Sequence, residues 1–385
     1  MGFLLHATLW YLTCQMGGVS NGFTDYNDLM LSRENSTNLD ALRSIAVLLV
    51  FLCHVLVTLG ISDVLGLPVA EFGRSGVLLF FVHTSLVLMM SMQRIKLARG
   101  WRDSTVFYIR RFFRIYPLSI VCIAVMLLLR IPAEPSAPFH SSDIGRIISN
   151  LLLVMNITEH PPILGPLWSL PFEVQMYLVL PILYLFVRRY RSTARLLFVA
   201  AIWAIAALAE RKALGRSFVL QFGPCFISGV LAYQFILKQR TEPVLSSITW
   251  PFAVTGLATF YVFVVRTSHA ASDVPAGWMM CLLLGMMIPQ WREIQAPLFG
   301  KVVKEIAKYS YGIYLFHNPI IWVSFVVLKS WNPVLRWSVL TVLMVVIPFI
   351  VFHVIESPMI EQGKKIAKLI ATKARPQSMV ASQVA

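Results

Sequence analysis

The sequence predicts an all-α, polytopic integral membrane protein with about ten transmembrane helices and one short re-entrant or interfacial helix. Of its 385 residues, 57% are hydrophobic and only 13% are charged, and the mean hydropathy is +0.72. Soluble domains are about 45–50% apolar and about 25% charged. Long apolar runs also recur along the whole chain, and basic residues gather in the stretches between them. A bilayer must therefore solvate much of the apolar surface.

Ten apolar runs are each close to the roughly 17–25 residues that a spanning helix needs. In chain order they cover residues 41–60, 75–92, 114–131, 167–187, 196–210, 218–237, 246–265, 276–291, 311–328 and 335–355. The runs 196–210 and 276–291 are the shortest of the ten. An eleventh run, 144–157, is shorter than the range for a span, so the distribution of charge decides how it is placed.

The basic loops set the topology. The loop between the second and third runs, 93–116, is rich in arginine and is the strongest cytoplasmic signal in the chain. If the run 144–157 does not cross the membrane, the basic loops 188–195 and 301–308 fall on the same side as the loop 93–116. The basic C-terminal tail then falls on that side too. Only the weaker loop 211–216 disagrees. We therefore expect ten spans with the N- and C-termini both cytoplasmic.

One membrane domain is expected over residues 39–360, because no internal repeat or separate soluble domain is visible. Residues 1–38 form an N-terminal extension, and residues 361–385 form a basic cytoplasmic tail. The net charge of +15 would suggest nucleic acid in a soluble protein. Here it is assigned to membrane topology, and no nucleic-acid partner is expected. No metal, nucleotide or cofactor motif occurs, so no bound metal or cofactor is expected.

Ionisable residues inside apolar spans are costly and are candidates for function. Arg43 and His54 lie eleven positions apart in the first run, which is a net rotation of about 20° and a rise of about 16 Å on a helix. They therefore share one face, with Arg43 near the cytoplasmic surface and His54 deep in the membrane. A histidine that only packs against neighbouring helices is the alternative for His54.

The third run begins with two arginines at i and i+3, Arg111 and Arg114, which face the same way. Paired guanidiniums suit phosphate groups, which they can bind in a bidentate manner. The alternative is that both only anchor the helix at the cytoplasmic surface. With Arg43 at the same level, the three arginines fit a phosphorylated donor whose reactive end reaches toward His54.

Further candidates lie in later runs. Glu173 is a carboxylate within the run 167–187, suited to orient a base, bind hydroxyls or pair with a cation. Tyr314 and His317 share a helical face that lines a cavity or packs against another helix. Pro319 follows them and is expected to kink the helix. His83 is isolated in its run and is assigned to packing.

Several segments carry a family resemblance. The segment LDALRSIAVLLVFLCHV (39–55) resembles LDGLRGIAALLVVLFH, including its R-x10-H spacing, and RRFFRIYPL contains an RxxR element. LWSLPFEVQMYLVLP (167–181) is similar to LWSLSVEEQFYLLWP, and SYGIYLFHNP (310–319) is similar to SYSLYLWHWP. These are patterns of acyltransferase family 3, whose members acylate bacterial surface polysaccharides, Nod factors and some antibiotics. The matches keep their order from about residue 39 to 358.

The resemblance implies an O-acyltransferase of the bacterial inner (plasma) membrane. It implies that His54 and Glu173 are catalytic, with His54 as the base or a transiently acylated group. Arg43, Arg111 and Arg114 then bind the donor, acetyl-CoA or another acyl-CoA, and the acceptor is a glycan or glycolipid. Residues expected at the acceptor or lining the cavity are Trp168, Ser169, Tyr177, Tyr314 and His317. Leu78, where the family often has Asp, departs from its patterns.

Three other functions are compatible with the same residues. A transporter or flippase of a lipid-linked glycan also carries buried Arg, His and Glu, but it needs no acyl donor. A structural component of a polysaccharide assembly would not need the intact R-x10-H and RxxR elements. An acyltransferase with a lipid donor would use the same arginines, because they bind any phosphate.

Overall fold

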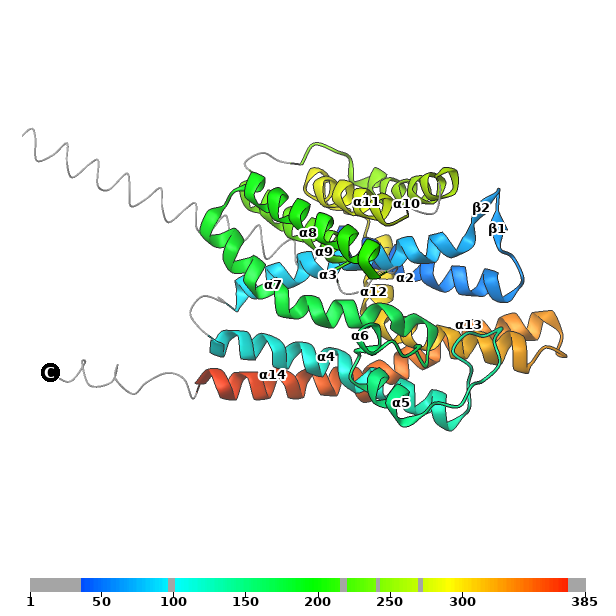
Figure 1. The fold of residues 1–385 in the computed structure, drawn as a ribbon. Coiled ribbons are helices and arrows are strands. Elements are labelled where there is room, and N and C mark those ends of the chain that lie inside the picture. Colours follow the sequence, from blue (N-terminus) through cyan, green and yellow to red (C-terminus); the bar gives the residue numbers. More distant parts are fainter. Residues whose placement is uncertain (1–35, 96–100, 215–219, 240–242, 269–272, 373–385) are drawn as a thin grey trace, which may run out of the picture.

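The computed structural model describes residues 36–95, 101–214, 220–239, 243–268 and 273–372 (Figure 1). Almost all of the expected N-terminal extension, residues 1–35, and residues 373–385 of the tail lie outside this part of the chain. The division into residues 1–38, 39–360 and 361–385 therefore stays a prediction.

Within the described residues, ten long helices correspond in order to the ten apolar runs. They are α2 (Thr37–Thr58), α3 (Val69–Arg94), α4 (Trp101–Leu128), α7 (Leu170–Tyr190), α8 (Thr193–Leu214), α9 (Gly223–Lys238), α10 (Trp250–Thr267), α11 (Asp273–Met287), α12 (Pro297–Trp322) and α13 (Pro333–Val351). Eight of these segments are long and apolar enough to cross a membrane. The other two, α9 and α11, have 16 and 15 residues. The predicted all-α membrane fold is confirmed.

Shorter elements connect the long helices. A two-stranded antiparallel hairpin, β1 (Asp63–Val64) and β2 (Leu67–Pro68), joins α2 to α3. Single 3-10 turns lie at Gly165–Ser169, Ser247–Thr249 and Ile288–Gln290, and α14 (Ser357–Thr372) ends the described chain. The hairpin lies at the right-hand end of the bundle in Figure 1, which we call the hairpin end.

The run 144–157 does not form a spanning helix. It forms two short helices, α5 (Ile144–Leu151) and α6 (Met155–Thr158), which lie beside α4 and the start of α7 (Figure 1). The side chain of Asp143 caps α5 by accepting a bond of 2.7 Å from the backbone N–H of Arg146. The side-chain amides of Asn156 and Gln175 bond to each other reciprocally, at 3.1 and 2.9 Å, which ties α6 to α7. This part of the predicted architecture, a short helical segment beside the spans, is present.

Helix α3 lies at the centre of the bundle, with 78% of its most apolar window buried. It packs against α2 and α9, and α2 packs in turn against α12. The approach of α9 to α3 depends on Gly229, because a Cβ there would overlap the Ser85 hydroxyl and the Val82 carbonyl. Small residues allow close approach between membrane helices. The candidate residues on α2 and α12 are therefore held on neighbouring rigid elements.

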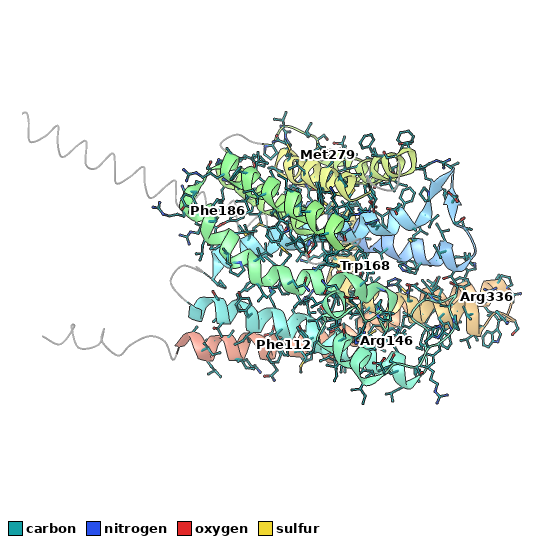
Figure 2. The ribbon with its side chains drawn as sticks, viewed as in Figure 1. Phe112, Arg146, Trp168, Phe186, Met279 and Arg336 are labelled. Carbon is teal, nitrogen blue, oxygen red and sulfur yellow. The ribbon has the colours of Figure 1, made fainter. Side chains whose placement is uncertain are left out.

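The outer helices expose apolar side chains. Only 11% and 17% of the apolar windows of α8 and of the segment containing α13 are buried. Phe112 and Met279, which are 50% and 55% exposed, also lie on the outside of the bundle (Figure 2). A contiguous apolar exterior of this kind is stable in lipid.

Two turns of π-helix follow prolines. Pro319 lies inside α12 and Val323–Val327 forms a π turn after it, while Pro348 in α13 precedes a second π turn, Phe352–Glu356. A proline removes one backbone donor, and π turns accommodate such disturbances of the ladder. The second turn ends at Glu356, whose side chain is fully buried.

Candidate functional site

Three neighbouring cavities follow the face of α2 that carries Arg43 and His54. The first, which we call the vestibule, has a volume of about 880 Å³ and lies where α2 and α12 begin. The second, the arginine cavity, has a volume of about 100 Å³ and shares Arg43 and Arg114 with the vestibule. The third, the histidine cavity, has a volume of about 360 Å³ and shares Val77 and Tyr314 with the second.

The vestibule is basic. Lys301, Lys304 and Lys308, all from the first turns of α12, line it together with Arg43 and Arg114. Its acidic lining residues are Asp40 and Glu305. The excess of cations over carboxylates gives this cavity a positive potential, which attracts polyanions.

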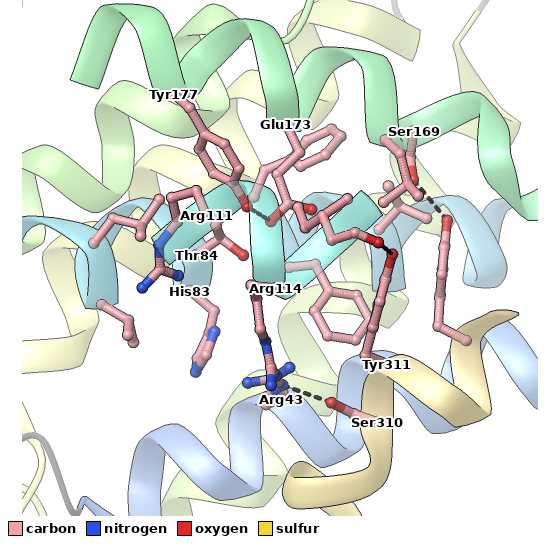
Figure 3. A pocket seen from close by; sticks show the side chains of 18 residues that line it. Arg43, His83, Thr84, Arg111, Arg114, Ser169, Glu173, Tyr177, Ser310 and Tyr311 are labelled. Atoms are coloured by element: carbon pink, nitrogen blue, oxygen red, sulfur yellow. Dashed lines mark hydrogen bonds between the residues drawn. The ribbon is translucent and has the colours of Figure 1, made fainter. Parts of the chain in front are cut away.

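The three arginines come from two helices and meet in the arginine cavity (Figure 3). Arg43 of α2 donates from Nε to the Ser310 hydroxyl at 2.6 Å. Arg114 of α4 forms an ion pair with Glu356, with 2.5 Å between Nη1 and Oε1. Arg111 lies 5.9 Å above the ring of Phe107, and its buried Nε has no hydrogen-bond partner within the described structure. Cationic hydrogen-bond donors therefore remain available for an anionic ligand.

The opposite wall of the arginine cavity comes from the first turns of α7. Tyr177 donates to Glu173 Oε1 at 2.6 Å, so the carboxylate is oriented by a neighbour one turn away (Figure 3). The Tyr314 hydroxyl donates to the carbonyl of Pro166 at 2.7 Å, and its oxygen lies 2.7 Å from the Ser169 hydroxyl. The Ser169 hydroxyl also lies 3.4 Å from the Pro166 carbonyl, so the two hydroxyls and this carbonyl form one hydrogen-bonded group.

His54 lies in the histidine cavity with a defined tautomer. Its Nδ1 is 2.9 Å from the backbone carbonyl of Val50. A carbonyl can only accept, so Nδ1 carries the proton and Nε2 keeps a free lone pair. The rings of His54 and His317 pack edge to face, with centroids 4.9 Å apart and planes at 69°. His54 therefore presents a basic nitrogen while its ring is held from two sides.

One residue from outside the spans reaches His54. Glu134, in the loop between α4 and α5, lies with Oε2 3.8 Å from His54 Nε2. It also lines the histidine cavity, together with Trp168. Partial burial raises the pKa of Glu134 above the ordinary value of a glutamate, and the neighbouring His54 opposes this shift.

The structure brings all ten candidate residues into this continuous region. Seven of them line the arginine cavity: Arg43, Arg111, Arg114, Ser169, Glu173, Tyr177 and Tyr314. His54 and Trp168 line the histidine cavity, and His317 packs on His54. Their roles stay predictions, because position alone does not assign chemistry.

Sequence reasoning missed several contributors. His83 lines the arginine cavity rather than standing isolated, because α3 turns this face toward α4 and α7. Glu356 was not singled out from the sequence, because its partner Arg114 is far away along the chain. Lys301, Lys304 and Lys308 had been assigned to topology alone. Glu134 carried no sequence signal, since its loop is polar and rich in proline.

Comparison with known proteins identifies the family of the chain. A family profile described as an acyltransferase domain matches residues 36–353. The chain is 28% identical over 315 residues to the acyltransferase MdmB of Streptomyces mycarofaciens, covering 74% of this chain and 78% of MdmB. It is 24% identical over 376 residues to the peptidoglycan O-acetyltransferase OatA of Listeria monocytogenes, covering 86% of this chain and 57% of OatA.

No solved structure matches significantly. The profile spans most of the chain, including both arginine elements, His54, Glu173 and His317. With its bundle of apolar helices and its place among acyltransferases, the protein is a membrane-bound enzyme that transfers an acyl group, and it belongs to acyltransferase family 3.

Proposed function

We propose that this enzyme transfers an acetyl group from acetyl-CoA to a hydroxyl group of a glycan or glycolipid. The observation that carries the proposal is the succession of three cavities, cationic at one end and containing His54 at the other. A donor with phosphates at one end and a thioester at the other matches this order. The relative OatA is named a peptidoglycan O-acetyltransferase, which supports acetyl as the acyl group and a glycan as the acceptor.

The phosphates of the donor are assigned to the vestibule and the arginine cavity. Arg43 and Arg114 line both cavities, and so they connect the binding of phosphate to the path toward His54. Guanidiniums bind phosphate with two parallel hydrogen bonds, whereas the vestibule lysines act as point charges. The pantetheine arm then extends along α2, about 16 Å from the level of Arg43 to that of His54.

The acceptor is assigned to the histidine cavity, which opens toward the hairpin end. Trp168 offers an apolar face to a sugar ring, and Glu71 and Glu134 offer acceptors for its hydroxyl groups. Arg74 also lines this cavity, but Asp273 binds it at 3.0 Å, and Glu71 lies 3.9 Å from it. Its charge is therefore already neutralised, which favours an uncharged polyol over an anion at this point.

In the proposed reaction, Nε2 of neutral His54 takes the proton of the acceptor hydroxyl as its oxygen attacks the thioester carbonyl carbon. A carbon–oxygen ester bond forms and the carbon–sulfur bond breaks. The leaving thiolate takes the proton from His54, which returns to its neutral form and releases the thiol. Val77 and Tyr314 line both the arginine cavity and the histidine cavity, so the thioester end of the donor would pass between them to meet the acceptor beside His54.

The distribution of basic residues supports an orientation with the vestibule on the cytoplasmic side of a bacterial inner membrane. The vestibule lysines would then face the cytoplasm, where acyl-CoA is found. Arg188 and Arg189, in the last turn of α7, would face it too. Both chain termini would lie on the same side, and the histidine cavity would open to the opposite one.

The test uses membranes that contain the full chain, labelled acetyl-CoA and a pool of membrane glycans. Wild type is compared with His54→Ala and Arg114→Ala, with protein amounts matched by immunoblot. Label in a glycan or glycolipid fraction with wild type only is the expected result. Full transfer by His54→Ala overturns the assignment of the base, and no transfer by wild type with any acceptor tried favours a transport function.

A further inference from the structure

The loop that follows α4 is fixed so that it delivers Glu134 to His54. The carbonyl of Ala133 accepts the backbone N–H of Gly165 at 2.9 Å. The side-chain amide of Asn318 donates to Glu134 Oε2 at 3.2 Å. That same oxygen is the one 3.8 Å from His54 Nε2. Two separate parts of the chain, at Gly165 and at Asn318, therefore hold the loop and its carboxylate beside the basic nitrogen.

Gly165 makes the space for this carboxylate. A Cβ added at Gly165 would overlap Oε1 of Glu134 and crowd the carbonyl of Ala133. The backbone of Gly165 has no unusual φ, so its conformation is one that other residues adopt. The absence of a side chain at this position is therefore needed for the close approach of Glu134 and not for a turn.

The surroundings of His54 include other titratable or charged groups. The elements packed around it contribute Cys53 from α2, Glu71 and Arg74 from α3, and Tyr314 and His317 from α12. Glu71 accepts a bond of 2.8 Å from Tyr261 of α10 through Oε2. Among the described residues, Glu134 is the only carboxylate within 4.0 Å of a ring nitrogen of His54.

We propose, on the basis of the acyl-transfer function above, that Glu134 is a positioning residue that stabilises the protonated form of His54 during transfer. When Nε2 takes the proton of the acceptor hydroxyl, the ring becomes a cation that faces the Glu134 carboxylate. The carboxylate accepts a hydrogen bond from the new N–H and does not itself take the proton. As the thiolate leaves and removes the proton, the interaction ends. Asn318 keeps the carboxylate in place throughout.

The test measures kcat against pH, and KM for acetyl-CoA, in wild type, Glu134→Gln, Glu134→Asp and Gly165→Ala. A charge-assisted hydrogen bond is worth enough to change kcat by about 10- to 100-fold. Glu134→Gln is expected to lower kcat by this factor. It should also shift the acidic limb of the profile to lower pH, because the protonated ring loses its counter-charge. Glu134→Asp should keep the limb near its wild-type position, and KM for acetyl-CoA should not change.

Gly165→Ala should displace the Glu134 carboxylate and shift the acidic limb of the pH profile to lower pH as well. The double variant Gly165→Ala/Glu134→Gln should show no larger shift than Glu134→Gln alone, because both changes remove the same interaction. Asp63→Asn is the matched control, since Asp63 is an exposed carboxylate in the hairpin at the same end of the bundle. An unshifted acidic limb in Glu134→Gln overturns the proposal. If wild type is active and His54→Ala is inactive at the same time, the proposed function still stands and only the role of Glu134 fails.

Discussion

The ion pair between Arg114 and Glu356 allows a quantitative test of how the arginine cavity is held together. The Glu356 side chain is fully buried, whereas that of Arg114 is 24% exposed. Removing one partner of a buried pair costs about 3–5 kcal/mol, because the other charge stays without compensation. Replacing Arg114 and replacing Glu356 should therefore lower the stability of the fold by different amounts. The reason is that only Arg114 reaches a water-accessible cavity when it loses its partner.

Arg114→Gln leaves the buried Glu356 unpaired and should carry the full cost. With about 2 cal/mol/K of unfolding entropy per residue, this lowers the apparent Tm by about 4–6 °C. Glu356→Gln leaves Arg114, whose guanidinium can turn toward the vestibule, and should lower the Tm less. The double substitution removes both charges, and so it should be more stable than Arg114→Gln alone.

The assay is thermal unfolding of the purified protein in one detergent, followed by a thiol-reactive dye that reports the buried cysteines. Scan rate and protein concentration are kept constant, because unfolding in detergent is often irreversible. A double substitution that loses as much stability as the two single losses added together would refute the coupling of this pair.

Three further predictions concern other parts of the site. Replacing Lys301 and Lys304 together by Gln should raise KM for acetyl-CoA up to about fivefold per lysine and leave kcat unchanged in steady-state kinetics. The rise in KM should be smaller at high salt, because salt screens the charges of the lysines. Tyr177→Phe removes the donor to Glu173 and should lower transfer, whereas the exposed Tyr190→Phe should not, as measured with the labelled donor. Because burial raises the pKa of Glu134, ionising this group costs stability as the pH rises through that pKa. The Tm of Glu134→Gln should therefore be higher than that of wild type at pH 8 but not at pH 4.

The helices and part of the site were predictable because membrane helices obey simple rules of length and periodicity. The spacing of Arg43 and His54 placed both on one face of α2, and the structure has them along the same line of cavities. The placement of the run 144–157 followed from charge alone and agrees with its two short helices. Patterns within a single helix carry this information, and no knowledge of neighbouring helices is needed.

Contacts between distant segments were not predictable in this way. Glu134 is 80 positions from His54 and 184 from Asn318, and its loop has neither periodicity nor a motif. His83 was assigned to packing because it is the isolated ionisable group of its apolar run. Its polar surroundings come from Arg43 and Glu173 on other helices. Such groups are recognised only when the packing of the bundle is known.

The π turn at Phe352–Glu356 has a consequence for how the end of the chain tolerates change. A π turn contains one residue more than an α turn, so removing one residue here would restore an ordinary α turn and leave the helix after it nearly in phase. Removing one residue from the regular helix beyond Glu356 would instead rotate all that follows by about 100°, and Gly363, which lies against Phe113, would be replaced at that contact by a larger neighbour. A one-residue deletion should therefore be tolerated within the π turn and should uncouple α14 from α4 when it is made a few residues later.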